Sequence, residues 1–240
     1  RLGIPPRLRP GLFSADCIEQ CSTERTQDGR EERRAAALAL PRGLRRAGAD
    51  LRHRDGGEHA RRLYPHVLAE VARAVEGGPA PRLLDLGCGT GALAELVLGE
   101  IPRARLSCVD LSPRMAEAAR ERLGGRAEVL LCDAERLPFR DGSFDAAWCN
   151  DSFHHYPDPE RTSFQAWRVL APGGALVVGD AWQPAPARAI MNAWMPHSKE
   201  GDVRIYSEAE MRRILGTWFS DVSWRRVGQT ACVAVARKGA

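Results

Sequence analysis

The chain has 240 residues, of which 44% are apolar and 28% are charged. This length suits one α/β domain with an added segment, because a single hydrophobic core grows to roughly 250 residues. No apolar run approaches the roughly 20 residues that span a bilayer, and the N-terminus lacks the continuous apolar segment of a secretory signal. We therefore expect a cytoplasmic protein with no membrane contact. Because the sequence begins with Arg1 and not with Met, we also expect its natural start to lie upstream.

The formal net charge is +4, and the basic residues are 33 Arg and only two Lys. Positions 1–50 hold ten Arg against seven acidic residues, which is +3 of that +4. The remainder is close to neutral, and its sequence has no Lys/Arg-rich stretch with interleaved aromatic residues. The charge therefore does not indicate a nucleic-acid partner.

Seven cysteines, an odd number, are spread over the chain, and most lie in apolar, strand-like runs. This pattern is typical of reduced thiols and not of a disulfide framework. Cys17 and Cys21 have no second pair or nearby His to complete a tetrahedral zinc site, so we expect no metal.

The first segment, residues 1–55, differs in texture from the rest. It begins with Pro5, Pro6 and Pro10 and continues rich in Arg and Glu, without a sustained helical or strand periodicity. Two interpretations remain open: a loosely ordered extension, or a lid or partner-binding arm. We expect the folded domain to comprise residues 56–240.

From Glu58 to Glu76 apolar residues recur at helical spacing, and Gly77-Gly78-Pro79 ends the segment. Strands and helices then alternate, which predicts βαβ units and a parallel sheet with helices on both faces. The expected strands are Arg82–Leu86, Arg105–Val109, Ala127–Leu131, Phe144–Cys149 and Ala175–Gly179. The expected helices are Ala92–Gly99, one opened by Ser112 and Pro113, and one from Asp158-Pro159 to Leu170. A turn is expected over Ala171–Gly174, after the last of these helices.

The last elements differ from this alternation. Ser207 and Glu210 form a capping box for a helix that runs to Leu215. Strands at Val222–Val227 and Thr230–Ala236 follow, joined by a turn too short for a parallel crossover. The sheet is therefore expected to end in an antiparallel hairpin.

A glycine-rich loop follows the first strand and leads directly into a helix. It reads Asp85-Leu86-Gly87-Cys88-Gly89-Thr90-Gly91, and its glycines let a ligand approach the backbone at the carboxyl edge of the sheet. By itself this loop also satisfies a dinucleotide-binding pattern. Asp110 ends the second strand, where a carboxylate can accept hydrogen bonds from ribose hydroxyls or cap the helix that Ser112 opens. Asp133 and Ala134 follow the third strand, where they can meet an adenine amino group.

In order along the chain, the segments DLGCGTGAL, VDLS, DAERLPF, DGSFDAAW, HHYPDP and RVLAPGGALVVGD resemble class I S-adenosylmethionine-dependent methyltransferases. The resemblance is greatest to the small-molecule branch that includes enzymes of ubiquinone, menaquinone and natural-product biosynthesis, and it covers about Glu58 to Lys238. It implies a Rossmann-like, three-layer α-β-α sandwich. Its mostly parallel seven-stranded sheet would have the order 3-2-1-4-5-7-6, with the last strand antiparallel.

The resemblance also implies which residues bind S-adenosylmethionine. Its methionine part would contact Asp85 and the loop residues Gly87, Cys88, Gly89, Thr90 and Gly91. Asp110 would bind the ribose hydroxyls, Leu111 and Met115 would pack against the adenine, and Asp133 and Ala134 would bind its amino edge. Asn150 would face the methionyl group. Cys88 is expected only to fill space in the loop.

Methyl transfer from a sulfonium requires mainly that the acceptor atom be positioned, and it requires a base only for a weak nucleophile such as an alcohol. His154 follows the fourth strand and Asp180 ends the fifth, and these strands are neighbours in the family. Our hypothesis is that His154 is the base and Asp180 its helper. The alternative is that this loop only shapes the methionine pocket.

Residues 181–206 form the predicted acceptor insertion. We expect a monomer or homodimer that O-methylates a small molecule. Two other functions compete with this prediction. One is a methyltransferase-fold protein without catalysis, and the other is a nicotinamide-dependent oxidoreductase. The Asp133-Ala134 pair and the terminal hairpin argue against the oxidoreductase.

Overall fold

A computed structural model describes residues 56–197 and 202–240. The predicted extension over residues 1–55 lies outside these ranges. None of the helices in the described ranges is both long and apolar enough to cross a bilayer.

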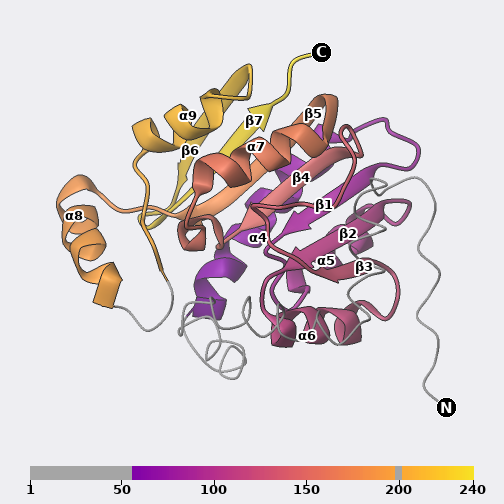
Figure 1. The fold of residues 1–240 in the computed structure, drawn as a ribbon, viewed down its shortest axis with the longest axis horizontal. Coiled ribbons are helices and arrows are strands. Elements are labelled where there is room, and N and C mark those ends of the chain that lie inside the picture. Colours follow the sequence, from indigo (N-terminus) through magenta and orange to yellow (C-terminus); the bar gives the residue numbers. More distant parts are fainter. Residues whose placement is uncertain (1–55, 198–201) are drawn as a thin grey trace, which may run out of the picture.

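Seven strands form one sheet of order β3-β2-β1-β4-β5-β7-β6 (Figure 1). β7 runs antiparallel to both of its neighbours, and the other pairs are parallel. The predicted fold class and strand order are therefore confirmed. The strands are β1 Arg82–Leu86, β2 Arg105–Asp110, β3 Glu128–Leu131, β4 Phe144–Asn150, β5 Leu170–Ala181, β6 Asp221–Val227 and β7 Ala231–Arg237.

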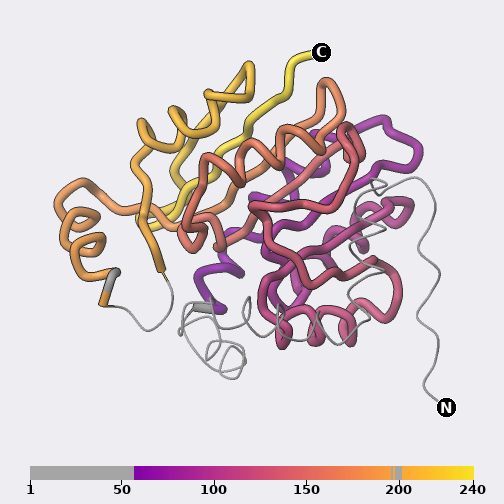
Figure 2. The backbone as a smooth tube through the Cα atoms, in the orientation of Figure 1, coloured from indigo at the N-terminus to yellow at the C-terminus, as the bar shows by residue number. Residues whose placement is uncertain are grey.

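Successive residues of a strand point to opposite faces of the sheet, and here both faces carry apolar residues that helices cover. Leu83 packs in the core with α4, α5 and α6, whereas its neighbour Leu84 packs in the core with α7 and α9. α8 stands apart from both layers, at the left of Figures 1 and 2, and none of its residues is buried. The helices are α4 Gly56–Ala74, α5 Ala92–Glu100, α6 Pro113–Leu123, α7 Pro159–Val169, α8 Ala185–Trp194 and α9 Glu208–Gly216, with short 3-10 helices at Phe153–His155 and Met195–His197.

Local side-chain chemistry starts three of these helices where the sequence predicts. Ser112 accepts a hydrogen bond from the N–H of Met115, and Asp158 accepts one from the N–H of Arg161. In the capping box, the Ser207 hydroxyl accepts from the Glu210 N–H, and the Glu210 carboxylate accepts from the Ser207 N–H. Each cap satisfies backbone N–H groups that the first turn of a helix leaves unpaired.

The turn predicted over Ala171–Gly174 lies inside β5. Phe144 pairs with Leu170, but Ala146 pairs with Ala175, so these residues form an irregular bulge in the strand. Gly173 has a φ of 76°, and its N–H donates to the Lys238 carbonyl at 3.1 Å. The Pro-Gly-Gly sequence correctly signals an irregular backbone, but pairing with β4 before and after the bulge keeps these residues within one strand.

Candidate active site

The loop after β1 is closely packed on one side and open at its middle. Gly87 has a φ of 70°, and a Cβ on it would lie 2.8 Å from the Ser152 hydroxyl oxygen, so only glycine fits there. A Cβ on Gly89 would meet no atom within 4 Å. The residues after β4 thus pack against the loop at Gly87, while the backbone at Gly89 is accessible to a ligand.

Asp110 at the end of β2 holds this loop in place. One carboxylate oxygen accepts the N–H of Gly89 and the other the N–H of Ser112, both at 2.8 Å. Ser112 itself caps α6, and Asp110 holds the N–H of this cap residue in place. Each Asp110 oxygen can still accept a further hydrogen bond, as ribose binding requires. Burial raises the pKa of Asp110 to about 6, although these two hydrogen bonds oppose the rise.

Asp85 is more deeply buried, with 2% of its surface exposed. Burial, and then the nearby Asp110, raise its pKa well above the ordinary value. Two carboxyl groups so close together in an apolar setting favour a cationic ligand, because a positive charge would stabilise their ionised forms.

The residues predicted to contact adenine lie beyond the ends of β2 and β3. Asp133 accepts the N–H of Glu135 at 2.8 Å, and Ala134 is buried. Leu111 is 40% exposed and Met115 is half-buried, so apolar surface is available beside Asp133. Parallel strands bring these groups to the same edge of the sheet as the glycine loop.

Asn150 ends β4, which neighbours β1 on the side away from β2. Its amide nitrogen donates to the Ala60 carbonyl of α4 at 3.4 Å. Its oxygen Oδ1 is buried and has no hydrogen-bond partner among the described residues. A buried acceptor without a donor is costly, so this atom fits a site that a polar ligand completes.

His154 and Asp180 come together as the strand order predicts. The His154 Nδ1 lies 2.5 Å from Asp180 Oδ1, and the His154 backbone N–H donates to Asp180 Oδ2 at 2.9 Å. Asp180 is 1% exposed and His154 is 8% exposed. Asp180 thus fixes both the ring and the backbone of His154.

A third group, Asp202, approaches the other ring nitrogen of His154. Its carboxylate oxygen lies 3.5 Å from His154 Nε2 and 3.3 Å from His155 Nδ1. Burial by itself lowers the pKa of His154, but the carboxylates of Asp180 and Asp202 outweigh burial and hold the pKa well above its ordinary value. These carboxylates therefore favour the protonated form of the His154 ring.

The sequence patterns do not single out Asp202, Asp151 or His59, and all three lie at this site. Asp151 follows Asn150, and its carboxylate lies 2.7 Å from His59 Nδ1 on α4. His59 precedes Asp151 by 92 residues, and Asp202 lies in the weakly patterned acceptor insertion. The one local sequence feature that points to Asp151 is its position directly after Asn150, the last residue of β4.

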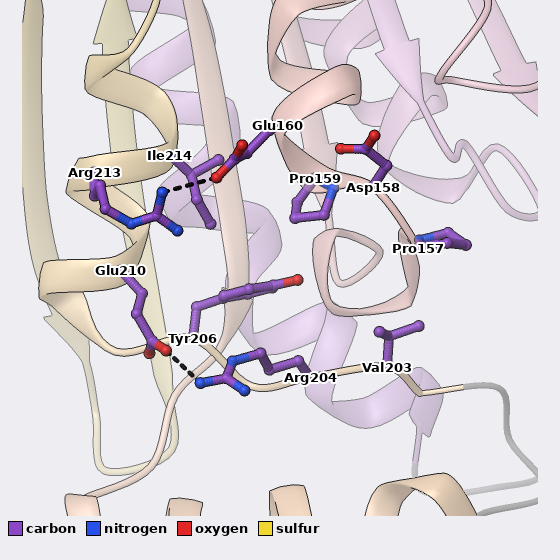
Figure 3. A pocket seen from close by; sticks show the side chains of 10 residues that line it. All are labelled: Pro157, Asp158, Pro159, Glu160, Val203, Arg204, Tyr206, Glu210, Arg213 and Ile214. Atoms are coloured by element: carbon purple, nitrogen blue, oxygen red, sulfur yellow. Dashed lines mark hydrogen bonds and ion pairs between the residues drawn. The ribbon is translucent and has the colours of Figure 1, made fainter.

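A pocket of about 370 Å³ lies between the start of α7 and α9 (Figure 3). Val203 links it to the site, because its N–H donates to the His154 carbonyl at 2.8 Å. Two ion pairs flank the Tyr206 ring: Arg213 with Glu160, and Arg204 with Glu210. Pro157, Asp158, Pro159 and Ile214 complete the lining.

Comparison with known proteins agrees with this geometry. Residues 84–178 match the family described as "Methyltransferase domain". The chain is 44% identical over 148 residues to a malonyl-[acyl-carrier protein] O-methyltransferase of Geobacter sulfurreducens, covering 58% of this chain and 55% of that protein. It is 40% identical over 123 residues to a demethylmenaquinone methyltransferase of Thermus thermophilus, covering 50% and 55%. The chain thus spans about half the length of these relatives.

Among solved structures, a Haemonchus contortus phosphoethanolamine N-methyltransferase in complex with S-adenosyl-L-methionine superposes with a TM-score of 0.64. That superposition covers 82% of this chain and 60% of the other, at 17% identity, so it supports the fold alone. The strand order, the glycine loop and the family match together define a class I methyltransferase fold. The family match over residues 84–178 and these relatives support the resemblance to S-adenosylmethionine-dependent methyltransferases of this class that the sequence motifs predict.

Proposed function

We propose that this protein transfers the methyl group of S-adenosylmethionine to an oxygen of a small-molecule acceptor and releases S-adenosylhomocysteine. The observation that carries this proposal is the His154–Asp180 pair, held at 2.5 Å at the ends of β4 and β5, on the same edge of the sheet as the glycine loop. When bound, the cofactor supplies a methyl carbon on a sulfonium, ready for in-line displacement.

The residues present fit this cofactor. The open backbone at Gly89 leaves room for the methionine part, and the buried carboxyls of Asp85 and Asp110 suit its ammonium group and the ribose hydroxyls. The orphaned Oδ1 of Asn150 offers an acceptor for a methionyl donor. Leu111 and Met115 provide apolar contact for adenine, and Asp133 lies where its amino group would be read.

His154 would act at Nε2, because Nδ1 is held by Asp180. An acceptor hydroxyl would take the place of Asp202 beside Nε2 and pass its proton to that nitrogen as the methyl group is transferred. A protonated His154 ring must first lose a proton, since only the neutral ring accepts one. Asp180 would then stabilise the imidazolium that forms.

The acceptor is proposed to lie between this pair and the described part of the predicted insertion, residues 181–197 and 202–206. α8 exposes Ile190 and Trp194, each to 72%, which favours an acceptor with an apolar part. Two relatives are named for methylation of malonyl-[acyl-carrier protein] and of demethylmenaquinone. The odd number of dispersed cysteines favours the reducing cytoplasm as the site of this reaction.

Calorimetry and a product assay test the proposal. We expect saturable binding of S-adenosylhomocysteine and none of NADH, and S-adenosylhomocysteine release when S-adenosylmethionine is offered with phenolic, carboxylic and quinol acceptors. Binding of NADH in place of S-adenosylhomocysteine would support an oxidoreductase. Tight cofactor binding without methyl transfer to any acceptor would support the non-catalytic alternative.

A further inference from the structure

His59 in the first turns of α4 connects three separate parts of the chain. Its Nδ1 lies 2.7 Å from Asp151 Oδ1, just after β4, and its Nε2 lies 3.3 Å from the Thr230 carbonyl, just before β7. The same carbonyl accepts the N–H of Trp182 at the exit of β5, at 2.8 Å. His59 therefore lies where the ends of β4, β5 and β7 meet.

The partners of His59 determine its protonation. A carbonyl oxygen only accepts hydrogen bonds, so the Nε2 that faces Thr230 carries a proton. The Asp151 oxygen at Nδ1 favours a proton on that nitrogen as well. These contacts favour the imidazolium form of His59, paired with Asp151. The Asp151 hydrogen bond raises the pKa of His59 above its ordinary value, although burial opposes this.

Asp151 has an unusual backbone conformation. Its φ is 55°, and no other non-glycine residue of the described chain has a positive φ. Its N–H donates to the Gly179 carbonyl at 2.7 Å, which ties it to β5. A residue with a Cβ adopts this left-handed conformation at a cost, which the surrounding structure must offset. Here the conformation accompanies a side chain that meets His59 and lies beside His154.

Several titratable groups from different parts of the chain surround the His154 ring. Asp180 and Asp202 contact its ring nitrogens, and the ring of His155 lies 4.0 Å away between centroids. A ring nitrogen of His154 and one carboxylate oxygen each of Asp151 and Asp180 all lie within 4.8 Å of one another. Burial raises the pKa of the neighbouring Cys149 and Cys232 thiols, which therefore stay uncharged. Within this group, Asp151 is the carboxylate that forms a hydrogen bond with His59, and the charge of Asp180 raises the pKa of His59 only as a smaller contribution.

We propose that His59 and Asp151 form a second histidine–carboxylate pair, which fastens the start of α4 to the end of β4 and sets the charge that Asp151 presents to His154. His59 is then a positioning residue that acts through Asp151. The use of this charge in catalysis rests on the proposed function, but the pair itself can be tested without turnover.

The test is a titration of the imidazole resonances of the full chain by NMR, with isotope-labelled histidine. His59→Gln removes a cation that offsets Asp151, so the pKa of His154 should rise. Asp151→Asn removes an anion, so the pKa of His154 should fall, and that of His59 should fall by about one pH unit or more. His66→Gln, also on α4, is the matched control and should leave both titrations unchanged.

Asp151→Gly guards against misfolding, because glycine adopts the left-handed backbone without strain. It should reproduce the effects of Asp151→Asn.

His59→Gln should also lower amide protection in the first two turns of α4 and weaken S-adenosylhomocysteine binding several-fold. The proposal is overturned if the His154 titration moves in the same direction in the His59 and Asp151 variants, or moves no more than in His66→Gln. Loss of turnover in His154→Ala would instead address the proposed function.

Discussion

The side chain of Val67 on α4 occupies the space that a Cβ of Gly179 on β5 would need. An ideal Cβ on Gly179 would lie 2.5 Å from Val67 Cγ2 and 3.7 Å from Leu63 Cβ. The missing side chain lets α4 lie directly on β5, one residue before Asp180. This contact brings His59 and Ala60 within reach of Asp151 and Asn150.

Gly179→Ala should therefore lower the free energy of unfolding by about 1–3 kcal/mol, as expected when a packed core receives an extra methyl group. Chemical denaturation measures this change. Gly99→Ala is the control, because a Cβ on Gly99 in α5 meets nothing within 4 Å. The control should stabilise the protein slightly, since alanine favours helix over glycine. Equal unfolding free energies for the two variants would contradict the close approach of α4.

His154→Ala should reduce methyl transfer roughly 10²- to 10⁴-fold, the usual contribution of a general base. S-adenosylhomocysteine affinity should stay within a few-fold of the wild type, measured by calorimetry. His66→Ala is the control, since His66 lies on α4 outside the proposed catalytic and acceptor sites. Near-normal turnover of His154→Ala with intact cofactor binding would exclude the base role.

The rate of methyl transfer should rise with pH in the wild type. The pKa of His154 is held above its ordinary value by Asp180 and Asp202, so the ring is protonated and inactive as a base below that pKa. The neutral ring appears as pH rises through it. A pH–rate profile with acceptor and cofactor saturating measures this, and a rate that falls with rising pH over this range would be incompatible with His154 as the base.

Asp180→Asn should destabilise the fold by about 3–5 kcal/mol, because it removes a buried charge that accepts from His154 at two positions and from the Ala181 N–H. The effect should depend on pH. The raised pKa of His154 gives stability that is fully present below the unfolded value near 6.5 and is lost as pH rises through the folded value. Unfolding free energies of wild type and variant at pH 6 and pH 9 should therefore differ more at pH 6, and a difference that grows with pH would refute this coupling.

S-adenosylhomocysteine should bind more weakly below about pH 6, where the raised pKa of Asp110 leaves its carboxyl neutral. The loss should be at most tenfold per pH unit, since one proton is involved. Asp110→Asn should bind more weakly than the wild type and lose the change in affinity near pH 6, whereas the exposed Asp221→Asn should behave as wild type. A pH dependence that persists in Asp110→Asn would assign it to another group.

The elements whose signals are local were predictable from the sequence. The caps at Ser112, Asp158 and Ser207 lie next to the N–H groups they satisfy, and the glycine loop needs its conformation within a few residues. Parallel strands then bring their carboxyl ends to one edge, so the approach of His154 and Asp180 also followed from strand order. The β5 bulge did not, because pairing with β4 on both sides of it decides that the chain continues as one strand.

The sequence by itself determined the fold class, the glycine-rich loop after β1 and the first histidine–carboxylate pair, because short-range chemistry and strand order specify them. Only the tertiary structure decided that His59 meets Asp151, that Asp202 faces His154, and that both ring nitrogens of His154 lie against carboxylates. These contacts join segments far apart in the chain. They depend on how closely α4 and the segment after α8 pack on the sheet, and no spacing of residues along the sequence encodes that distance.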